Sequence, residues 1–288
     1  MAGNGEPPDH VRRTTGWTSL WAWNADTGGG MAELAIFVIN LDRAAARMQR
    51  MAQRFAALGL QPLRVAAVDA AAPAFAAPGY APGAGDRWAL LPVEQAIFES
   101  HRQIWQRMVD QDLPAALICE DDLLLSRDLP QALADLDPGA HGVIKLDGFS
   151  AARRYGPLQG DLRAIAEPVP SAACYALSQS AARQLLQDSQ QYCATLDDFV
   201  FAPRVGLQPM QRFPALAVQE MCVSAPTDAR VSALARPDKG PLGFRLRQEL
   251  RRGLRRLRRK LGGDRALIAR GGVIARPDLA PDLPPYRS

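Results

Sequence analysis

Three consecutive carboxylates, Glu120, Asp121 and Asp122, follow an apolar run in the segment ALICEDDLLLS, residues 116–126. In an extended chain successive side chains point to opposite sides, so Glu120 and Asp122 would face one way and Asp121 the other. Mg²⁺ and Mn²⁺ prefer carboxylate oxygens, and a bound cation relieves the repulsion between neighbouring carboxylates. We therefore predict a divalent-cation site, Mn²⁺ or Mg²⁺, at Glu120 and Asp122. The alternative interpretation of the triplet is a solvated turn.

A second group of polar residues, Asn40, Asp42, Arg43 and Arg47, follows the apolar run at residues 33–40. A turn from a strand into a helix can hold a nucleotide, because an arginine guanidinium matches two phosphate oxygens at once. The alternative is that Asp42 caps the helix and that the arginines are solvated.

The apolar pattern predicts the elements that position these residues. Residues 33–40 are typical of a buried strand, and in residues 43–59 the apolar side chains recur at helical spacing as far as Gly59. Residues 60–70 then read as a second strand, and the order strand, helix, strand indicates a parallel α/β unit. Further elements are expected as a long loop at 71–89, a helix at 92–110, strands at 113–122 and 142–148, and a helix capped by Ser178.

The composition argues against several classes of protein. Of the 288 residues 48% are hydrophobic, which is enough for a large core. The four cysteines and three histidines are scattered and show no zinc-ligand spacing, so a zinc site is not expected. Cys119, Cys174 and Cys222 lie in apolar or helix-like surroundings, which indicates buried thiols in a reducing compartment. No stretch has the roughly 20 apolar residues of a membrane span, and residues 1–30 are expected to be a flexible arm, with Met31 as a possible natural start. We expect a cytoplasmic protein.

A basic segment lies near the C-terminus. Residues 245–260 contain nine Lys or Arg residues and a single acid, Glu249. Leucines recur every three or four residues from Leu246 to Leu261, which predicts an amphipathic helix with a leucine stripe opposite an arginine face. Such a helix at 245–261 can lie on an anionic membrane surface, here the inner face of the cytoplasmic membrane. Alternatively, its leucines pack on its own domain. No aromatic residues interleave the arginines, so we expect no nucleic-acid partner.

An ordered set of motifs resembles glycosyltransferase family 25, the lipooligosaccharide and lipopolysaccharide-core galactosyltransferases and their collagen-modifying relatives. The set covers roughly residues 33–220 and consists of FVINLDRAAARMQRM, VAAVDA, EQAIFESHRQIWQRMV, ALICEDD, ACYALS and LDDF. The resemblance implies a single GT-A-like, Rossmann-type α/β domain with a mostly parallel central sheet, at 31–225. Residues 226–288 would then be a basic helix and a Pro-rich tail.

The resemblance also implies roles for individual residues. The DXD-like motif falls on Glu120, Asp121 and Asp122, with Asp122 as the first choice of metal ligand and Asp121 near the sugar or ribose. The predicted donor-binding residues also include those that follow the first two strands and the Ser-His pair of the helix at 92–110, namely Asn40, Asp42, Arg43, Arg47, Asp69, Ser100 and His101. A histidine buried in the core is the alternative for His101.

Asp197 and Asp198 are the predicted catalytic pair. An inverting transfer needs a carboxylate that accepts the proton of the attacking hydroxyl, and either aspartate could serve. Asp198 precedes an apolar run that would bury it and raise its basicity. The alternative is that the pair caps a short helix at Phe199.

The sequence therefore predicts a metal-dependent, inverting glycosyltransferase. It would move a hexose, with galactose from UDP-galactose as the usual case in the family, from a nucleotide sugar to a saccharide or lipid-linked acceptor such as the lipopolysaccharide core. The competing hypothesis is a non-catalytic protein that binds a nucleotide sugar or a membrane surface on a degenerate transferase fold.

Overall fold

The computed structural model describes residues 34–223 and 238–287, so the predicted N-terminal arm lies outside the described residues. The N-terminal part comprises β1 (Ala35–Asn40), the 3-10 turn η1 (Asp42–Ala44), α1 (Ala45–Ala57), β2 (Leu63–Ala66), α2 (Pro92–Asp110), β3 (Ala115–Glu120), β4 (Leu123–Leu125), α3 (Leu129–Asp135) and α4 (Pro138–His141). The middle part comprises β5 (Val143–Lys145), β6 (Asp147–Gly148), β7 (Arg153–Gln159), β8 (Leu162–Ile165), β9 (Cys174–Ser178), α5 (Gln179–Asp188) and α6 (Leu196–Val200). The C-terminal part comprises β10 (Met210–Arg212), β11 (Ala217–Gln219), α7 (Glu220–Val223), α8 (Leu242–Arg258), the kinked turn η3 (Arg259–Gly263), α9 (Asp264–Ala269) and β12 (Val273–Ala275).

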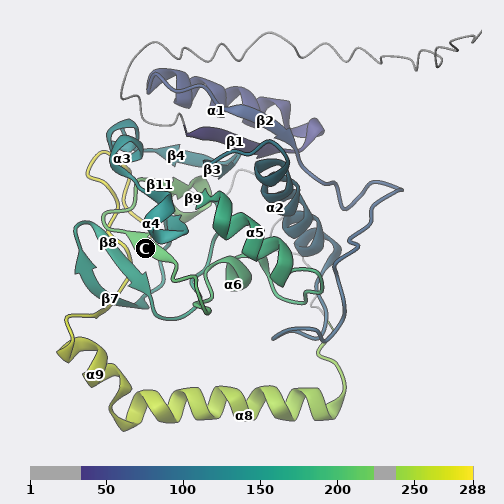
Figure 1. The fold of residues 1–288 in the computed structure, drawn as a ribbon, viewed down its shortest axis with the longest axis vertical. Coiled ribbons are helices and arrows are strands. Elements are labelled where there is room, and N and C mark those ends of the chain that lie inside the picture. The colour runs from purple at the N-terminus through teal and green to yellow at the C-terminus, as the bar shows by residue number, and fades with distance from the viewer. Residues whose placement is uncertain (1–33, 224–237, 288) are drawn as a thin grey trace, which may run out of the picture. The chain divides into compact units, whose positions relative to one another are not determined.

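Apolar side chains of the central strands alternate between two cores, one on each face of the sheet. In β1, Phe37 and Ile39 join the core that contains Trp105 of α2, whereas Ile36 and Val38 join the core that contains Phe55 of α1. The continuous apolar run of β1 is thus explained by burial on both faces. Helix α2 packs against α5 (Figure 1).

Most of the predicted local elements are confirmed. Helix α1 and helix α2 lie where the apolar spacing placed them, and α2 has the predicted bounds. Strands β1, β2 and β3 lie within the predicted runs. The Ser178 side chain accepts a hydrogen bond from the Ala181 N–H and caps α5 as expected.

The prediction of a mostly parallel sheet is wrong beyond the first strands. In the described residues the large sheet has nine strands in the order β12-β7-β8-β10-β5-β9-β3-β1-β2. Strand β1 is parallel to β2 and β3, but β9 is antiparallel to both β3 and β5, and β7, β8, β10 and β12 add further antiparallel pairs. An apolar run indicates that a strand is buried but says nothing about its direction, so the antiparallel strands could not be predicted from the sequence pattern.

The C-terminal residues, predicted as a Pro-rich tail, pack on the domain. Strand β12 pairs with β7. Further on, Ala280 and Leu283 are buried in the core that α1 covers, and the Asp282 carboxylate accepts hydrogen bonds from the Ser126 hydroxyl at 2.7 Å and the Arg127 N–H at 2.8 Å. The described part of the chain from Leu34 onward is therefore one structural unit.

We predict that Leu283→Ala lowers the free energy of unfolding by about 2–5 kcal/mol, because it leaves a cavity in this core. The exposed Leu158, which is 51% accessible, is the matched control, and Leu158→Ala should change stability by less than about 0.5 kcal/mol. Urea denaturation of both variants measures the difference. Equal stability of the two would show that the C-terminal residues contribute nothing to the core.

Candidate active site

The carboxylate triplet lies where β3 ends, and its side chains separate as predicted. Gln219, the last residue of β11, places its side-chain amide between two of them: Nε2 donates to Glu120 Oε2 at 3.0 Å and lies 3.3 Å from both carboxylate oxygens of Asp122. The predicted convergence of Glu120 and Asp122 on one side is therefore confirmed. In this structure the side-chain N–H donor of Gln219 occupies the point at which the two carboxylates meet.

Asp121 points to the other side and joins the end of β1. Its Oδ2 atom accepts a hydrogen bond from Asn40 Nδ2 at 2.5 Å, and its Oδ1 atom lies 3.3 Å from the Arg47 guanidinium. Asn40 is only 1% exposed and also accepts a hydrogen bond from Arg64 Nε at 3.0 Å. The turn after β1 and the triplet after β3 thus form one polar site, because β1 and β3 are parallel neighbours whose carboxyl ends meet at one edge of the sheet.

Ser171, in the loop before β9, connects the rest of the cluster. Its N–H donates to Asp197 Oδ2 at 3.2 Å, and its hydroxyl donates to Asp147 Oδ2 at 2.6 Å and lies 3.1 Å from Gln219 Oε1. The residue has a φ of 68°, a left-handed conformation that is uncommon for any residue other than glycine. One strained residue therefore contacts Asp147, Gln219 and Asp197 at the same time.

Lys145 supplies a buried positive charge beneath this cluster. Its side chain and that of Asp147 are both 0% exposed, and Lys145 Nζ lies 2.6 Å from Asp147 Oδ1 and donates to the Ser171 carbonyl at 2.5 Å. The other protein contact of Asp147 Oδ1 is the Cys174 N–H, at 3.1 Å. Asp147 is thus neutralised and fully hydrogen-bonded, as a buried charge must be.

The carboxylates near the surface are less well neutralised. Burial, and then the charges of Asp122, Asp147 and Asp121, raise the pKa of Glu120 to about 8. Burial also raises the pKa of Asp122, although its contact with Gln219 acts in the opposite direction. Burial and the neighbouring carboxylates thus oppose the ionisation of Glu120, and a cation bound beside it would favour its charged form.

Asp42, Arg43 and Asp69 lie further out on the same edge. Arg43 forms an ion pair with Asp69, and Asp42 forms one with Arg64. A hydrogen bond from the Ala71 N–H to Asp69 Oδ1, at 2.9 Å, lowers the pKa of the Asp69 carboxyl and closes a turn. In this structure these three residues pair with protein groups at the surface, and their assignment to the donor stays a prediction.

Ser100 and His101 lie inside the molecule. The Ser100 hydroxyl accepts a hydrogen bond from the Val68 N–H at 2.9 Å, which fixes the segment that follows β2. His101 is 1% exposed, its Nδ1 atom lies 2.9 Å from the Tyr175 hydroxyl, and burial lowers its pKa to about 3, so it is neutral. These are the contacts of residues that support the site, and direct contact of either residue with a donor stays a prediction.

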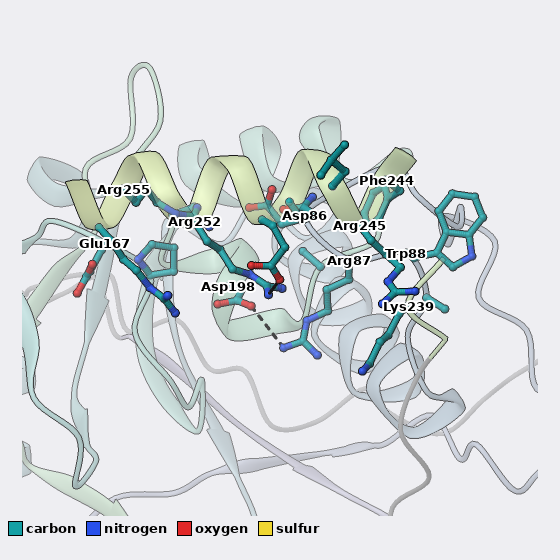
Figure 2. Close-up of a pocket in the computed structure, with 18 of the residues that line it drawn as sticks. Asp86, Arg87, Trp88, Glu167, Asp198, Lys239, Phe244, Arg245, Arg252 and Arg255 are labelled. Atoms are coloured by element: carbon teal, nitrogen blue, oxygen red, sulfur yellow. Dashed lines mark hydrogen bonds and ion pairs between the residues drawn. The ribbon is translucent and has the colours of Figure 1, made fainter. Parts of the chain in front are cut away.

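Asp197 and Asp198 are adjacent in α6 but face different surroundings. Asp197 joins Ser171 and the acidic cluster, whereas Asp198 borders a cavity of about 1080 Å³ beside α8. Figure 2 shows Asp198 with Arg87 next to it, across this cavity from α8; the guanidinium Nη2 lies 3.6 Å from Asp198 Oδ2. Burial, and then the charge of Asp197, raise the pKa of Asp198. Asp197 thus contacts the acidic cluster, and Asp198 borders the cavity.

Residues 33–200, more than half of the chain, match the glycosyltransferase family 25 (LPS biosynthesis protein). The chain belongs to glycosyltransferase family 25. It is similar, at 39% identity over 54 residues, to the lacto-N-neotetraose biosynthesis glycosyltransferase LgtE of Neisseria meningitidis serogroup B (strain ATCC BAA-335 / MC58). That similarity spans only 19% of either chain.

Among solved structures, the chain is similar to one described as mannose-1-phosphate geranyltransferase from Thermus thermophilus. The sequence identity is 10% and the TM-score 0.33, with 63% of this chain and 74% of that chain covered. A likeness at this level supports no conclusion about function. The part of the chain that the family model matches, residues 33–200, contains the triplet Glu120 to Asp122 and the pair Asp197 and Asp198.

A divalent metal ion fits this family 25 site only if ligands other than protein side chains complete it. Within residues 34–223 and 238–287, no three His, Cys, Asp or Glu side chains are arranged to hold a metal ion by themselves. Glu120 and Asp122 do converge at Gln219 Nε2. Two carboxylates together with substrate phosphates and water are a common way for proteins to bind Mg²⁺, so the residues fit the group in that mode.

Four residues of this site were not predicted from the sequence, namely Lys145, Asp147, Ser171 and Gln219. Asp147 had a usable signal, because it is an acid at the carboxyl end of the predicted strand 142–148, in the same position as the triplet. Lys145 had one too, as a charge inside that apolar strand. Ser171 and Gln219 had none, because long-range contacts alone bring them to the site.

Proposed function

We propose that this family 25 enzyme is a metal-dependent, inverting glycosyltransferase that moves a hexose, galactose from UDP-galactose, to a saccharide of the lipopolysaccharide core. The observation that carries the proposal is the convergence of Glu120 and Asp122 at Gln219. Ser171 connects Gln219 to Asp197, and Asp198 is the next residue in the chain. The saccharide acceptor is supported by the family and by a relative named for lacto-N-neotetraose biosynthesis.

The donor would bind at the carboxyl ends of β1 and β3. Arg47, half-exposed beside Asp121, offers a guanidinium for phosphate oxygens. Asn40 fixes Asp121 in place, so that its carboxylate can accept hydrogen bonds from sugar or ribose hydroxyls. Nucleotides commonly bind at this edge of an open α/β sheet.

Glu120 and Asp122 would hold Mn²⁺ or Mg²⁺ here, together with the donor diphosphate. The bound ion would act as a Lewis acid and stabilise the negative charge that develops on the leaving diphosphate. Gln219, which contacts both carboxylates in this structure, would orient them for the metal ion.

Asp198 would act as the general base. Its carboxylate faces the cavity, from which an acceptor hydroxyl can approach, and burial and the charge of Asp197 raise its pKa and hence its basicity. Asp197, held by the Ser171 N–H, would position α6 relative to the metal-binding carboxylates. Thr195 donates a hydrogen bond to Asp198 Oδ2 at 3.0 Å and orients the base.

Helix α8 would place the enzyme on an anionic membrane surface. The leucine stripe is exposed rather than packed on the domain, with exposed fractions from 51% for Leu257 to 78% for Leu261, just beyond the helix. The hypothesis that these leucines cover the protein's own core is therefore wrong. None of the described helices is both long and apolar enough to cross a membrane, so attachment through α8 would be to the surface, by leucine burial and arginine contact with anionic lipid.

We predict that Asp122→Asn leaves folding nearly unchanged but removes most activity, because it exchanges a charged metal ligand for a neutral amide of the same shape. In wild type, UDP with Mn²⁺ should raise the melting temperature, since a ligand of the native state stabilises it. The variant should lose most of that rise. Normal turnover of Asp122→Asn at saturating Mn²⁺ would contradict the metal assignment.

For the base, Asp198→Asn should retain the thermal shift with UDP and Mn²⁺ but lose turnover by about two to four orders of magnitude. Asp197→Asn is the matched control on the same helix, and its loss of turnover should be smaller. Single-turnover rates of sugar transfer measure both. The reverse order of the two losses would transfer the role to Asp197.

For the membrane, replacing Leu250, Leu254 and Leu257 with Gln should weaken co-sedimentation with anionic vesicles by up to about tenfold per leucine, because each substitution removes apolar burial. The exposed Leu158 and Val205 supply a control, since Leu158→Gln and Val205→Gln should not affect sedimentation. Added salt should weaken binding of the wild type. Undiminished sedimentation of the triple variant would refute the proposal.

A further inference from the structure

The cavity of about 1080 Å³ beside α8 has a strongly basic lining. Nine basic and five acidic side chains border it, so it carries an excess of positive charge. Arg245 and Arg252 extend from α8 into this space towards Asp198 (Figure 2). Four of the basic residues have an acidic partner; Arg252, for example, lies 2.6 Å from Glu249.

Other cations of the lining have no such partner. Among the residues that the structure describes, every carboxylate oxygen is more than 4 Å from the side-chain nitrogens of Arg153, Lys239, Arg245, Arg255 and Arg256. Cations gathered in a concave space, rather than dispersed over a convex surface, raise the local concentration of anions. Guanidinium groups bind phosphate through two parallel hydrogen bonds.

Gln248 provides an independent sign of a missing ligand. It lies on the cavity side of α8 and is 5% exposed, the most buried residue of the helix. Its Nε2 atom is shielded from solvent and has no hydrogen-bond partner. A buried amide donor without an acceptor destabilises the protein. Gln248 lines the same cavity as the unpaired cations, so one anionic group with several oxygens would satisfy both.

We infer that this cavity binds the acceptor, and that the acceptor is a saccharide that carries a phosphate group. This inference rests on the proposed function, because Asp198 as the base places the attacking hydroxyl at the cavity wall. The phosphate lies beside Gln248 and Arg245, which are about one helical turn apart on α8, and the saccharide extends from it towards Asp198. The donor phosphates bind elsewhere, at Arg47 and the metal-binding carboxylates.

Glucose 6-phosphate and glucose are a matched pair of probes that differ in the phosphate alone. Titration calorimetry on the full chain, with and without saturating UDP and Mn²⁺, should show millimolar binding of glucose 6-phosphate in both conditions and no binding of glucose. Displacement of glucose 6-phosphate by UDP with Mn²⁺ would overturn the inference, because the cavity would then belong to the donor site. Absence of binding would overturn it too.

Variants on α8 test the assignment to this cavity. Gln248→Met removes the donor at nearly constant volume, and it should weaken binding of glucose 6-phosphate about tenfold or more while the melting temperature of the free protein stays the same or rises. A role of Gln248 in the fold alone would lower the melting temperature and spare binding, which would contradict the inference.

A second pair of variants on α8 tests whether net charge alone explains the binding. The double variant Arg245→Gln/Arg255→Gln should weaken binding of glucose 6-phosphate about tenfold, whereas Arg247→Gln/Arg258→Gln, which changes the net charge equally at residues outside the cavity lining, should leave it unchanged. Equal losses would show a non-specific attraction and overturn the inference. Failure of UDP with Mn²⁺ to bind wild type, with glucose 6-phosphate binding intact, would instead count against the proposed function.

Discussion

The buried ammonium group of Lys145 is the constraint on which the acidic site depends. Three carboxylates of the triplet, Asp147 and Asp197 meet at one end of the sheet, and without a cation beneath them their mutual repulsion would oppose folding. Lys145 contacts Asp147 and the Ser171 carbonyl, and its Nζ atom lies 5.0 Å from the centre of the Phe201 ring. A charge taken out of water is tolerated only where such contacts replace its hydration. The same contacts fix the position of Ser171 and, through it, of Asp197 and Gln219.

The two sides of α6 have opposite charge imbalances. Among the described residues, the carboxylates of Glu120, Asp122 and Asp147 outnumber the one buried cation, Lys145, on the side of Asp197, and the basic side chains outnumber the acids on the side of Asp198. The proposed transferase, which would join a metal-bound anionic donor to an anionic acceptor, would need both surroundings within reach of one base. Adjacent residues of a helix point about 100° apart, so a pair of aspartates can meet both surroundings from a single turn.

The sequence predicted what local pattern determines. The alternation of side chains along β1, the helical spacing of α1 and α2, and the cap at Ser178 depend on neighbours in the chain, and the structure contains all of them. The common direction of Glu120 and Asp122 follows from the same local geometry. Strand direction, the contribution of Gln219 and the conformation of Ser171 depend on residues distant in sequence, and the pattern held no information on them.

The sequence pattern also could not predict which face α8 turns towards the domain, because an amphipathic helix can bury either side. Contacts at both ends of α8 determine which face of the helix is turned towards the domain. At its start Phe244 packs edge-on against Trp88, with ring centres 5.4 Å apart, and Gly240 lies so close to Trp88 that an added Cβ would overlap the indole ring. Beyond its end, Arg259 pairs with Glu167, and Arg154 pairs with Asp264 of α9 at 2.7 Å.

A helix held at one end alone would swing its arginines away from Asp198. Held at both ends, α8 keeps Gln248 inside and the leucine stripe outside, so the cavity exists before any ligand binds. The return of the chain to the sheet through β12 is what supplies the second attachment. The residues after α8, which in sequence resemble a tail, therefore determine which face of the helix meets the cavity and which stays exposed.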